Sequence, residues 1–149
     1  MHIKVIAVGL LAMLAASPAW ADEAAGMIKT AQGKVEVVRG GQRLPAGPGF
    51  AVMQSDKVQT GAASSVGITL RDNTLLSAGA NSSLSLDQYA FNPTTHQGRI
   101  DATLKRGTLS VISGKIAKTS PDAVRFRTTA VTLGVRGTEF ILEAHSEED

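Results

Sequence analysis

Apolar and polar residues alternate with a period of two along most of the chain. The alternation is cleanest in 66–70, where Val, Ile and Leu are separated by Gly and Thr, and it recurs in 83–87, 100–104 and 124–128. Successive side chains of a β-strand point to opposite faces, so this pattern predicts strands with one buried face. No long segment keeps a helical spacing of apolar residues without interruption by Gly, Pro or Ser. The chain is therefore predicted to be all β.

Tight turns separate the predicted strands. Gly40 and Gly41 supply the positive φ angles of a hairpin turn, which predicts a first hairpin from 34–39 and 42–44. Three further turns are expected, at 71–73, 79–81 and 105–107. Short strands joined in this way are typical of one β-sandwich-like or roll-like domain of antiparallel strands. A solenoid-like stack remains the alternative, because Gly-x-Leu steps recur weakly.

The beginning of the chain has the pattern of a secretory signal. A basic start that includes Lys4 precedes a short apolar run, and Ala19 and Ala21 supply the small residues of a cleavage site. We expect cleavage after Ala21, a periplasmic location and no spanning segment in the mature chain. The expected organisation is a signal peptide at 1–21, a flexible lead at 22–27, a β domain at 28–143 and an acidic tail at 144–149.

Charge is distributed unevenly along the mature chain. With Lys4 removed, 14 basic residues face 13 acidic ones, which gives no reason to expect nucleic acid binding. Eight basic residues lie between Arg99 and Arg136, whereas the segment 139–149 holds five acids. Two interpretations stay open: solvated strand faces that discourage aggregation, or a surface for an anionic envelope partner. Since the chain has no Cys, no disulfide holds the fold together.

The residues show no pattern of an enzyme. The chain lacks a Gly-x-Ser-x-Gly elbow, a His-Glu-x-x-His pair and a phosphate loop, so we expect no enzymatic activity and no cofactor. Asp72, Asp87 and Asp101 are each isolated from other oxygen ligands along the sequence. Turn chemistry explains them without a metal ion, and no metal site is predicted.

Three segments together resemble a known family. They are Asp56-Lys57-Val58-Gln59-Thr60-Gly61, the segment 67–76 around Arg71-Asp72-Asn73, and the segment 124–140, which ends in Arg-Gly-Thr-Glu-Phe. In this order they resemble the FecR domain, the periplasmic module of iron-dicitrate-type signalling regulators. Members that regulate sigma factors carry a cytoplasmic segment and a spanning helix before this module, and we expect neither here. The resemblance implies a periplasmic binding or scaffolding module in envelope signalling or assembly.

The last of these segments has its own physical interpretation. Its motif consists of Gly134, Gly137, Thr138, Glu139 and Phe140, with Arg136 between the two glycines. The glycines permit a backbone bend, and the Arg136 guanidinium offers five donors to turn carbonyls or to a carboxylate. Arg136 is therefore either part of a structural clasp or a contact for an acidic partner. Arg125 and Arg127, on the polar face of a predicted strand, are further candidate contacts.

A polar segment at 88–98 adds aromatic candidates. Tyr89, Phe91 and His96 lie beside amide and hydroxyl groups, a mixture that suits contact with a sugar or a protein. Tyr89 and Phe91 share one face if the strand continues, and in that case they cap the core instead. The partner is thus expected to be an envelope protein or, alternatively, a carbohydrate or cell-wall polymer.

Overall fold

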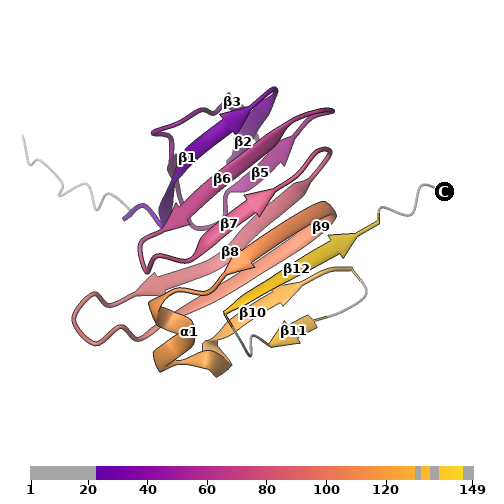
Figure 1. Ribbon diagram of the computed structural model, residues 1–149. Helices are drawn as coiled ribbons and strands as arrows, with labels where there is room; N and C mark the ends of the chain where they lie inside the picture. Colours follow the sequence, from indigo (N-terminus) through magenta and orange to yellow (C-terminus); the bar gives the residue numbers. More distant parts are fainter. Residues whose placement is uncertain (1–22, 130–131, 135–137, 146–149) are drawn as a thin grey trace, which may run out of the picture.

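The computed structural model describes residues 23–129, 132–134 and 138–145. The expected signal segment and cleavage site, as well as Arg136 and Gly137, lie outside the described residues. Twelve strands make up most of the described chain (Figure 1). They are β1 (Gly26–Gln32), β2 (Val35–Arg39), β3 (Gln42–Pro45), β4 (Ala51–Val52), β5 (Lys57–Thr60), β6 (Ser65–Leu70), β7 (Leu75–Ala78), β8 (Ser83–Phe91), β9 (Gly98–Ile112), β10 (Val124–Arg127), β11 (Thr132–Gly134) and β12 (Glu139–Ala144).

The strands form one sheet that curls around a single core (Figure 1). One half has the order β4-β1-β6-β7-β9-β12, and the other has the order β3-β2-β5-β8-β9-β10-β11. Of the described strand pairs, only β9 and β10 run parallel. The prediction of an all-β domain is confirmed. The strands curl as in a roll, and they do not form the solenoid-like stack that the sequence left open.

β9 belongs to both halves of the sheet. Its residues up to Arg106 pair with β8 and β10, whereas the residues from Gly107 onward pair with β7 and β12. Gly107 has a φ of +92°, and the β8–β9 register shifts beside it, at Ser83. The turn expected at 105–107 is therefore wrong. Glycine permits the positive φ, but neighbouring strands on both sides of the bend keep the chain extended, so the strand bends without reversing.

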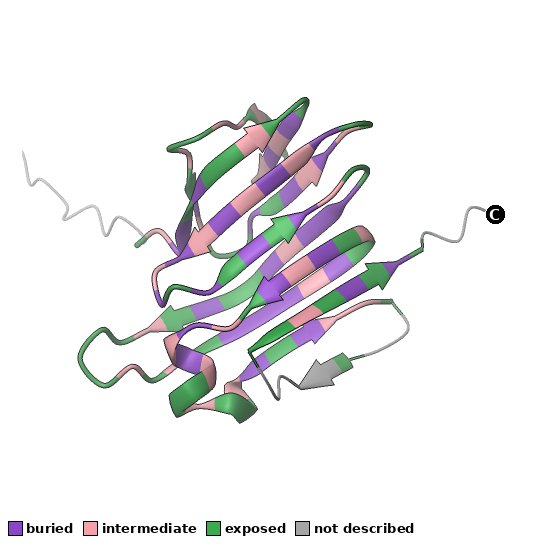
Figure 2. Ribbon diagram, viewed as in Figure 1, coloured by how far each residue is buried: buried purple, intermediate pink, exposed green. Residues whose placement is uncertain are grey.

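Buried and exposed positions alternate along the strands, as the sequence pattern predicts (Figure 2). In β10, Val124 and Phe126 are buried in the core while Arg125 is exposed. The first hairpin is confirmed as β2 and β3. The turns at 71–73 and 79–81 are confirmed as well, and each contains an asparagine with positive φ, Asn73 at +69° and Asn81 at +51°.

Three local features differ from the expectation. β1 begins at Gly26 and buried Ala25 donates its amide to the Val52 carbonyl (2.8 Å), so the expected flexible lead at 22–27 runs into a strand. A helical turn, α1 (Lys115–Thr119), and a 3-10 turn, η1 (Pro121–Ala123), connect β9 to β10. The polar segment at 88–98 begins and ends in strand, because β8 runs to Phe91 and β9 begins at Gly98. Pairing of β1 with β4 and β6, which are distant in sequence, orders the chain from Gly26 onward, beyond its local signal.

Candidate binding site

A row of side chains crosses the outer face of the half-sheet that contains β8. Residues paired across neighbouring strands lie on the same face of a sheet, so the register places them in one line. From β3 to β10 the row consists of Arg43, Val38, Lys57, Ser85, Thr103 and Arg127. None of these residues is buried. The row is therefore open to solvent.

A groove of about 620 Å³ lies along this row. We call it the basic groove. It is lined by Arg43, Lys57, Gln59, Ser83, Ser85, Asp87, Thr103, Lys105, Arg106 and Thr129. Four cationic side chains thus face one carboxylate, and the remaining lining residues offer hydroxyl and amide groups. This composition favours an anionic ligand or partner.

Most of the groove's cations have no charged partner. Within the described part of the chain, Lys57, Lys105 and Arg106 form no ion pair. The carboxylate of Asp87 accepts hydrogen bonds from the hydroxyls of Ser85 (2.7 Å) and Thr103 (2.6 Å). The carboxylate of the groove is therefore hydrogen-bonded to hydroxyl groups and not paired with a cation of the described chain, so Lys57, Lys105 and Arg106 are available to an anionic ligand.

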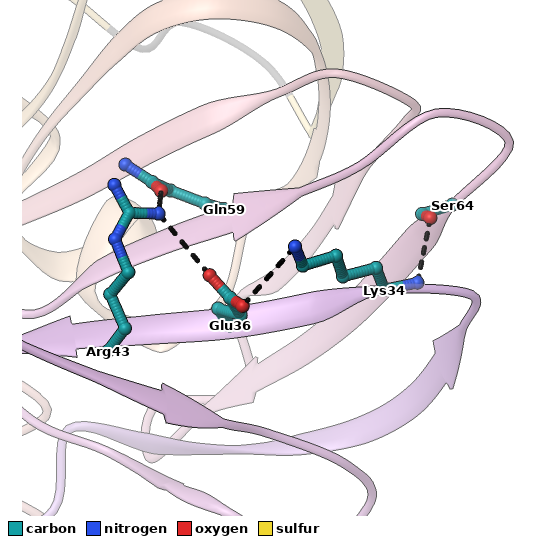
Figure 3. A network of polar contacts seen from close by, with 5 residues as sticks. All are labelled: Lys34, Glu36, Arg43, Gln59 and Ser64. Atoms are coloured by element: carbon teal, nitrogen blue, oxygen red, sulfur yellow. Dashed lines mark hydrogen bonds and ion pairs between the residues drawn. The ribbon is translucent and has the colours of Figure 1, made fainter.

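Arg43 takes part in an exposed network at one end of the groove (Figure 3). Its Nη1 lies 3.4 Å from Glu36 Oε2 and 3.3 Å from Gln59 Oε1. Glu36 Oε1 also lies 3.6 Å from Lys34 Nζ. Exposed ion pairs of this length contribute little free energy, because water and salt screen them. Replacing Glu36 at Arg43 by another carboxylate would therefore cost little free energy.

The predicted contact residues Arg125 and Arg127 lie on the same outer face as the groove. Arg127 Nη2 donates to Asp101 Oδ2 (2.8 Å), and Asp101 is buried. Asp101 Oδ1 has no hydrogen-bond partner among the described residues. Arg125, paired in register with Asp101, is exposed and forms no ion pair in the described chain. Arg127 thus neutralises a buried carboxylate, whereas Arg125 is open to a partner.

The structure separates the three aromatic candidates of 88–98. Tyr89 is only 7% exposed, so its side chain belongs to the core, the alternative that the sequence left open. Its hydroxyl accepts from the Asp72 amide (3.0 Å) and donates to Asp72 Oδ1 (3.1 Å). Phe91 and His96 are partly exposed, and their rings stack with centroids 6.2 Å apart. They lie on the β8–β9 hairpin, away from the residues of the groove.

Asp72 lies in the turn between β6 and β7, and its side chain stabilises this turn by hydrogen bonds. Its carboxyl group is 0% exposed and accepts hydrogen bonds from Thr74 Oγ1 (2.7 Å) and from the amide of Ile116 in α1 (3.2 Å). These protein donors take up the oxygens that a metal ion would require. In the described ranges, no group of three His, Cys, Asp or Glu side chains is placed to hold a metal.

Burial alters the ionisation of Tyr89. Desolvation, with the nearby Asp72 charge second, raises the Tyr89 pKa above its ordinary value of 10.0. The neutral phenol is thus preferred in the folded state, so its stabilisation is complete below about pH 10 and is lost as the pH rises further. Tyr89 is the chain's one tyrosine. We expect the tyrosinate absorbance of the folded protein to rise at higher pH than that of the protein in denaturant.

The Tyr89→Phe variant is the control for this titration. It should show no tyrosinate signal, and its stability should fall less than that of the unsubstituted protein above pH 10, since it lacks the group that titrates. Circular dichroism at each pH verifies that the sheet is intact. Coincident titrations of the folded and denatured protein would contradict the assignment.

Comparison with known proteins places the chain in a family. The family model described as FecR protein matches residues 56–149. The chain belongs to the FecR protein family. Neither the curated proteins nor the solved structures contain a match. The resemblance noted in the sequence is thereby confirmed, and FecR membership suggests a role related to envelope signalling.

The FecR match covers only part of the folded unit. It begins at Asp56 and includes β5 to β12, whereas β1 to β4 precede it. β1 nevertheless pairs with β6, β2 pairs with β5, and Ile28 and Val37 lie fully inside the core. Residues 26–52 therefore complete the sheet that the FecR region begins. FecR domains are typically periplasmic, and no helix among the described residues is long and apolar enough to cross a membrane.

The glycine-rich FecR motif is described in part. Gly134 ends β11, Thr138 is exposed, and Glu139 and Phe140 begin β12. The ring of Phe140 packs edge-on against buried Phe126, with centroids 5.4 Å apart. Phe140, the last residue of the motif, thus packs against the core. The interpretation of Arg136 as a clasp or a contact stays a prediction.

Sequence reasoning did not find the basic groove as a site. Lys57 and Arg43 come from strands far from the basic segment 99–136, and Lys105 and Arg106 were assigned to a turn. The available signal was that Lys57, Ser85 and Thr103 occupy polar positions of alternating strands. That signal identifies outward side chains, but only the register brings them together.

Proposed function

We propose that this FecR-family chain is an exported, periplasmic binding or scaffolding module that contacts another envelope protein through the basic groove. One observation carries the proposal: the groove gathers four cationic side chains around a single carboxylate that hydroxyl groups already satisfy. Clustered cations on an exposed face attract an acidic partner and orient its approach. Family membership, with its suggested role in envelope signalling, supports a protein as the partner.

The proposed contact surface extends beyond the groove. Arg125 is exposed on the same face, so it would enlarge the cationic area toward β10. Arg127 would contribute less, because it is already paired with Asp101. Phe91 and His96 remain proposed contacts at a separate place, the β8–β9 hairpin, and Arg136, which lies outside the described residues, also remains a proposed contact.

A carbohydrate or cell-wall polymer is the second candidate. Hydroxyl and amide side chains such as Gln59, Ser83 and Thr103 alternate with the cations in the groove, and they would suit the hydroxyl groups of a sugar. Among the described lining residues, however, there is no aromatic ring on which a sugar could stack. The lack of an aromatic ring in this lining favours an acidic protein over a polysaccharide.

Charge reversal in the groove tests the proposal. The double variant Lys57→Glu/Lys105→Glu should weaken retention of an envelope protein by about tenfold or more, since two attractive charges become repulsive. The immobilised protein is exposed to envelope extract and, separately, to isolated cell-wall polymer. Retention should also fall as salt is raised, because the groove is open to solvent.

The matched control is Lys29→Glu/Lys118→Glu. Both lysines are exposed, neither lines the groove, and the net charge changes equally. If this control loses retention to the same degree, net charge and not the groove is responsible. Retention on wall polymer alone, sensitive to the groove variant, would replace the protein partner with the polysaccharide.

A further inference from the structure

Among the described strands, β12 is paired along one edge only. That edge pairs with β9, and the backbone hydrogen bonds found for the described residues do not reach its other side. The remaining edges are protected: β4 and β11 are only two and three residues long, and β3 carries Arg43 and ends at Pro45. β12 has six residues without proline or lysine. Such an edge is a template for one more strand.

The outward side chains of β12 have a simple pattern. Ile141 is 69% exposed, and Glu139 and Glu143 are exposed on either side of it. Ile112 and Leu75, 41% and 38% exposed, extend the apolar surface onto β9 and β7. Ile141 lies diagonally beside Ile112, because their partners in the ladder are Ser110 and Glu139. The edge thus presents an apolar centre between two negative charges.

The other side chains of β12 point inward, toward the core. Leu142 is buried, and Ala144 ends the strand at the bend of β9, opposite Gly107. An added strand would therefore place small or apolar side chains next to Leu142. Its outward side chains would lie next to Glu139, Ile141 and Glu143.

A second copy of the chain fits this edge poorly. Antiparallel pairing of two β12 strands about Ile141 sets Glu139 of one copy opposite Glu143 of the other. Like charges in directly opposed positions destabilise a strand pair. The two carboxylates thus disfavour self-pairing and favour cations.

We propose that the edge of β12 away from β9 binds an extended segment of another protein, in which an apolar residue is flanked two positions away on each side by lysine or arginine. The segment adds to the sheet as the next strand. Backbone hydrogen bonds along the edge supply affinity, and the pairs with Glu139 and Glu143 supply selectivity. This edge lies on the other half of the sheet from the basic groove, so the two surfaces are independent.

Two synthetic peptides test the proposal on the full chain. Both have blocked ends and a central isoleucine; one carries lysine two positions away on each side, and the other carries glutamate there. The lysine peptide should bind about tenfold more tightly, because two opposite-charge pairs replace two like-charge pairs. Hydrogen–deuterium exchange should slow within 139–144 when it binds.

The charge-swapped variant Glu139→Lys/Glu143→Lys provides the matched control. Both positions are exposed, so the variant should fold, and it should prefer the glutamate peptide by a similar factor. Failure of the preference to reverse in a folded variant would overturn the proposal. Equal binding of both peptides by the unsubstituted protein would do the same, as would slowed exchange in β5 and β8 in place of β12. If the variant does not fold, the proposal is tested on the unsubstituted protein alone, by its preference for the lysine peptide and by the slowed exchange within 139–144.

Discussion

Replacing Gly107 with alanine is expected to lower the free energy of unfolding by about 2 to 5 kcal/mol. A positive φ costs a residue with a side chain about 1 to 2 kcal/mol, and overlap with packed atoms adds about 1 to 3 kcal/mol. Gly107 has a φ of +92°, and a Cβ there would lie 2.5 Å from Ser82 Cα and overlap Ser82 Oγ. Urea unfolding followed by circular dichroism measures the loss.

Gly40→Ala separates the two contributions. Gly40 also has a positive φ, +57°, but a Cβ there would meet nothing within 4 Å. Its loss should therefore be only the backbone part, about 1 kcal/mol. Equal losses at Gly40 and Gly107 would show that Ser82 does not approach the bend of β9 closely.

Replacing Asp72 with alanine should lower the free energy of unfolding by about 3 to 5 kcal/mol, since several buried donors lose their acceptor together. The carboxyl group accepts from the amide and hydroxyl of Thr74, from the Tyr89 hydroxyl and from the Ile116 amide. It thus joins the β6–β7 turn to β8 and to α1. Thermal and urea unfolding of the purified variant provide the measurement.

Asp87→Ala is the matched control for Asp72→Ala. Asp87 also accepts two hydroxyl hydrogen bonds, from Ser85 and Thr103, but it is exposed, so water can replace them. Its loss should stay below about 1 kcal/mol. A comparably small loss for Asp72→Ala would refute the role of Asp72 as the junction of three segments.

The two proposed surfaces have opposite chemistry. The basic groove offers cations and hydroxyls on the half-sheet of β5 and β8, whereas the edge of β12 offers an isoleucine between two carboxylates on the other half. If each proposed surface binds its partner, the domain would hold two partners at once. That arrangement is what a scaffolding module requires, and each surface can be removed without the other.

Local patterns were sufficient for much of the fold. The alternation of 66–70 and 124–128 predicted β6 and β10, because a strand with one buried face needs apolar residues at every second position. The turns at 71–73 and 79–81 were predicted for a similarly local reason, since Asn tolerates a positive φ in a short turn. The family was recognised from segments that lie within the matched region.

The interpretation of 105–107 shows where local information ends. A glycine with positive φ is compatible with a reversal of the chain and with a bend in a continuous strand. β7, β8, β10 and β12 all pair with β9, and this pairing selects the bend. The placement of Tyr89 likewise involves a distant residue, because its buried hydroxyl is hydrogen-bonded to Asp72 of another hairpin.

The sequence by itself determined the all-β class, most turns and the family, because each depends on residues close together along the chain. The tertiary structure alone decided that Arg43, Lys57 and Arg127 share a face and that, among the described strands, β12 pairs with β9 only. Strand order and register are set by contacts between residues far apart in sequence, so a linear pattern specifies which side chains face outward but not which of them become neighbours.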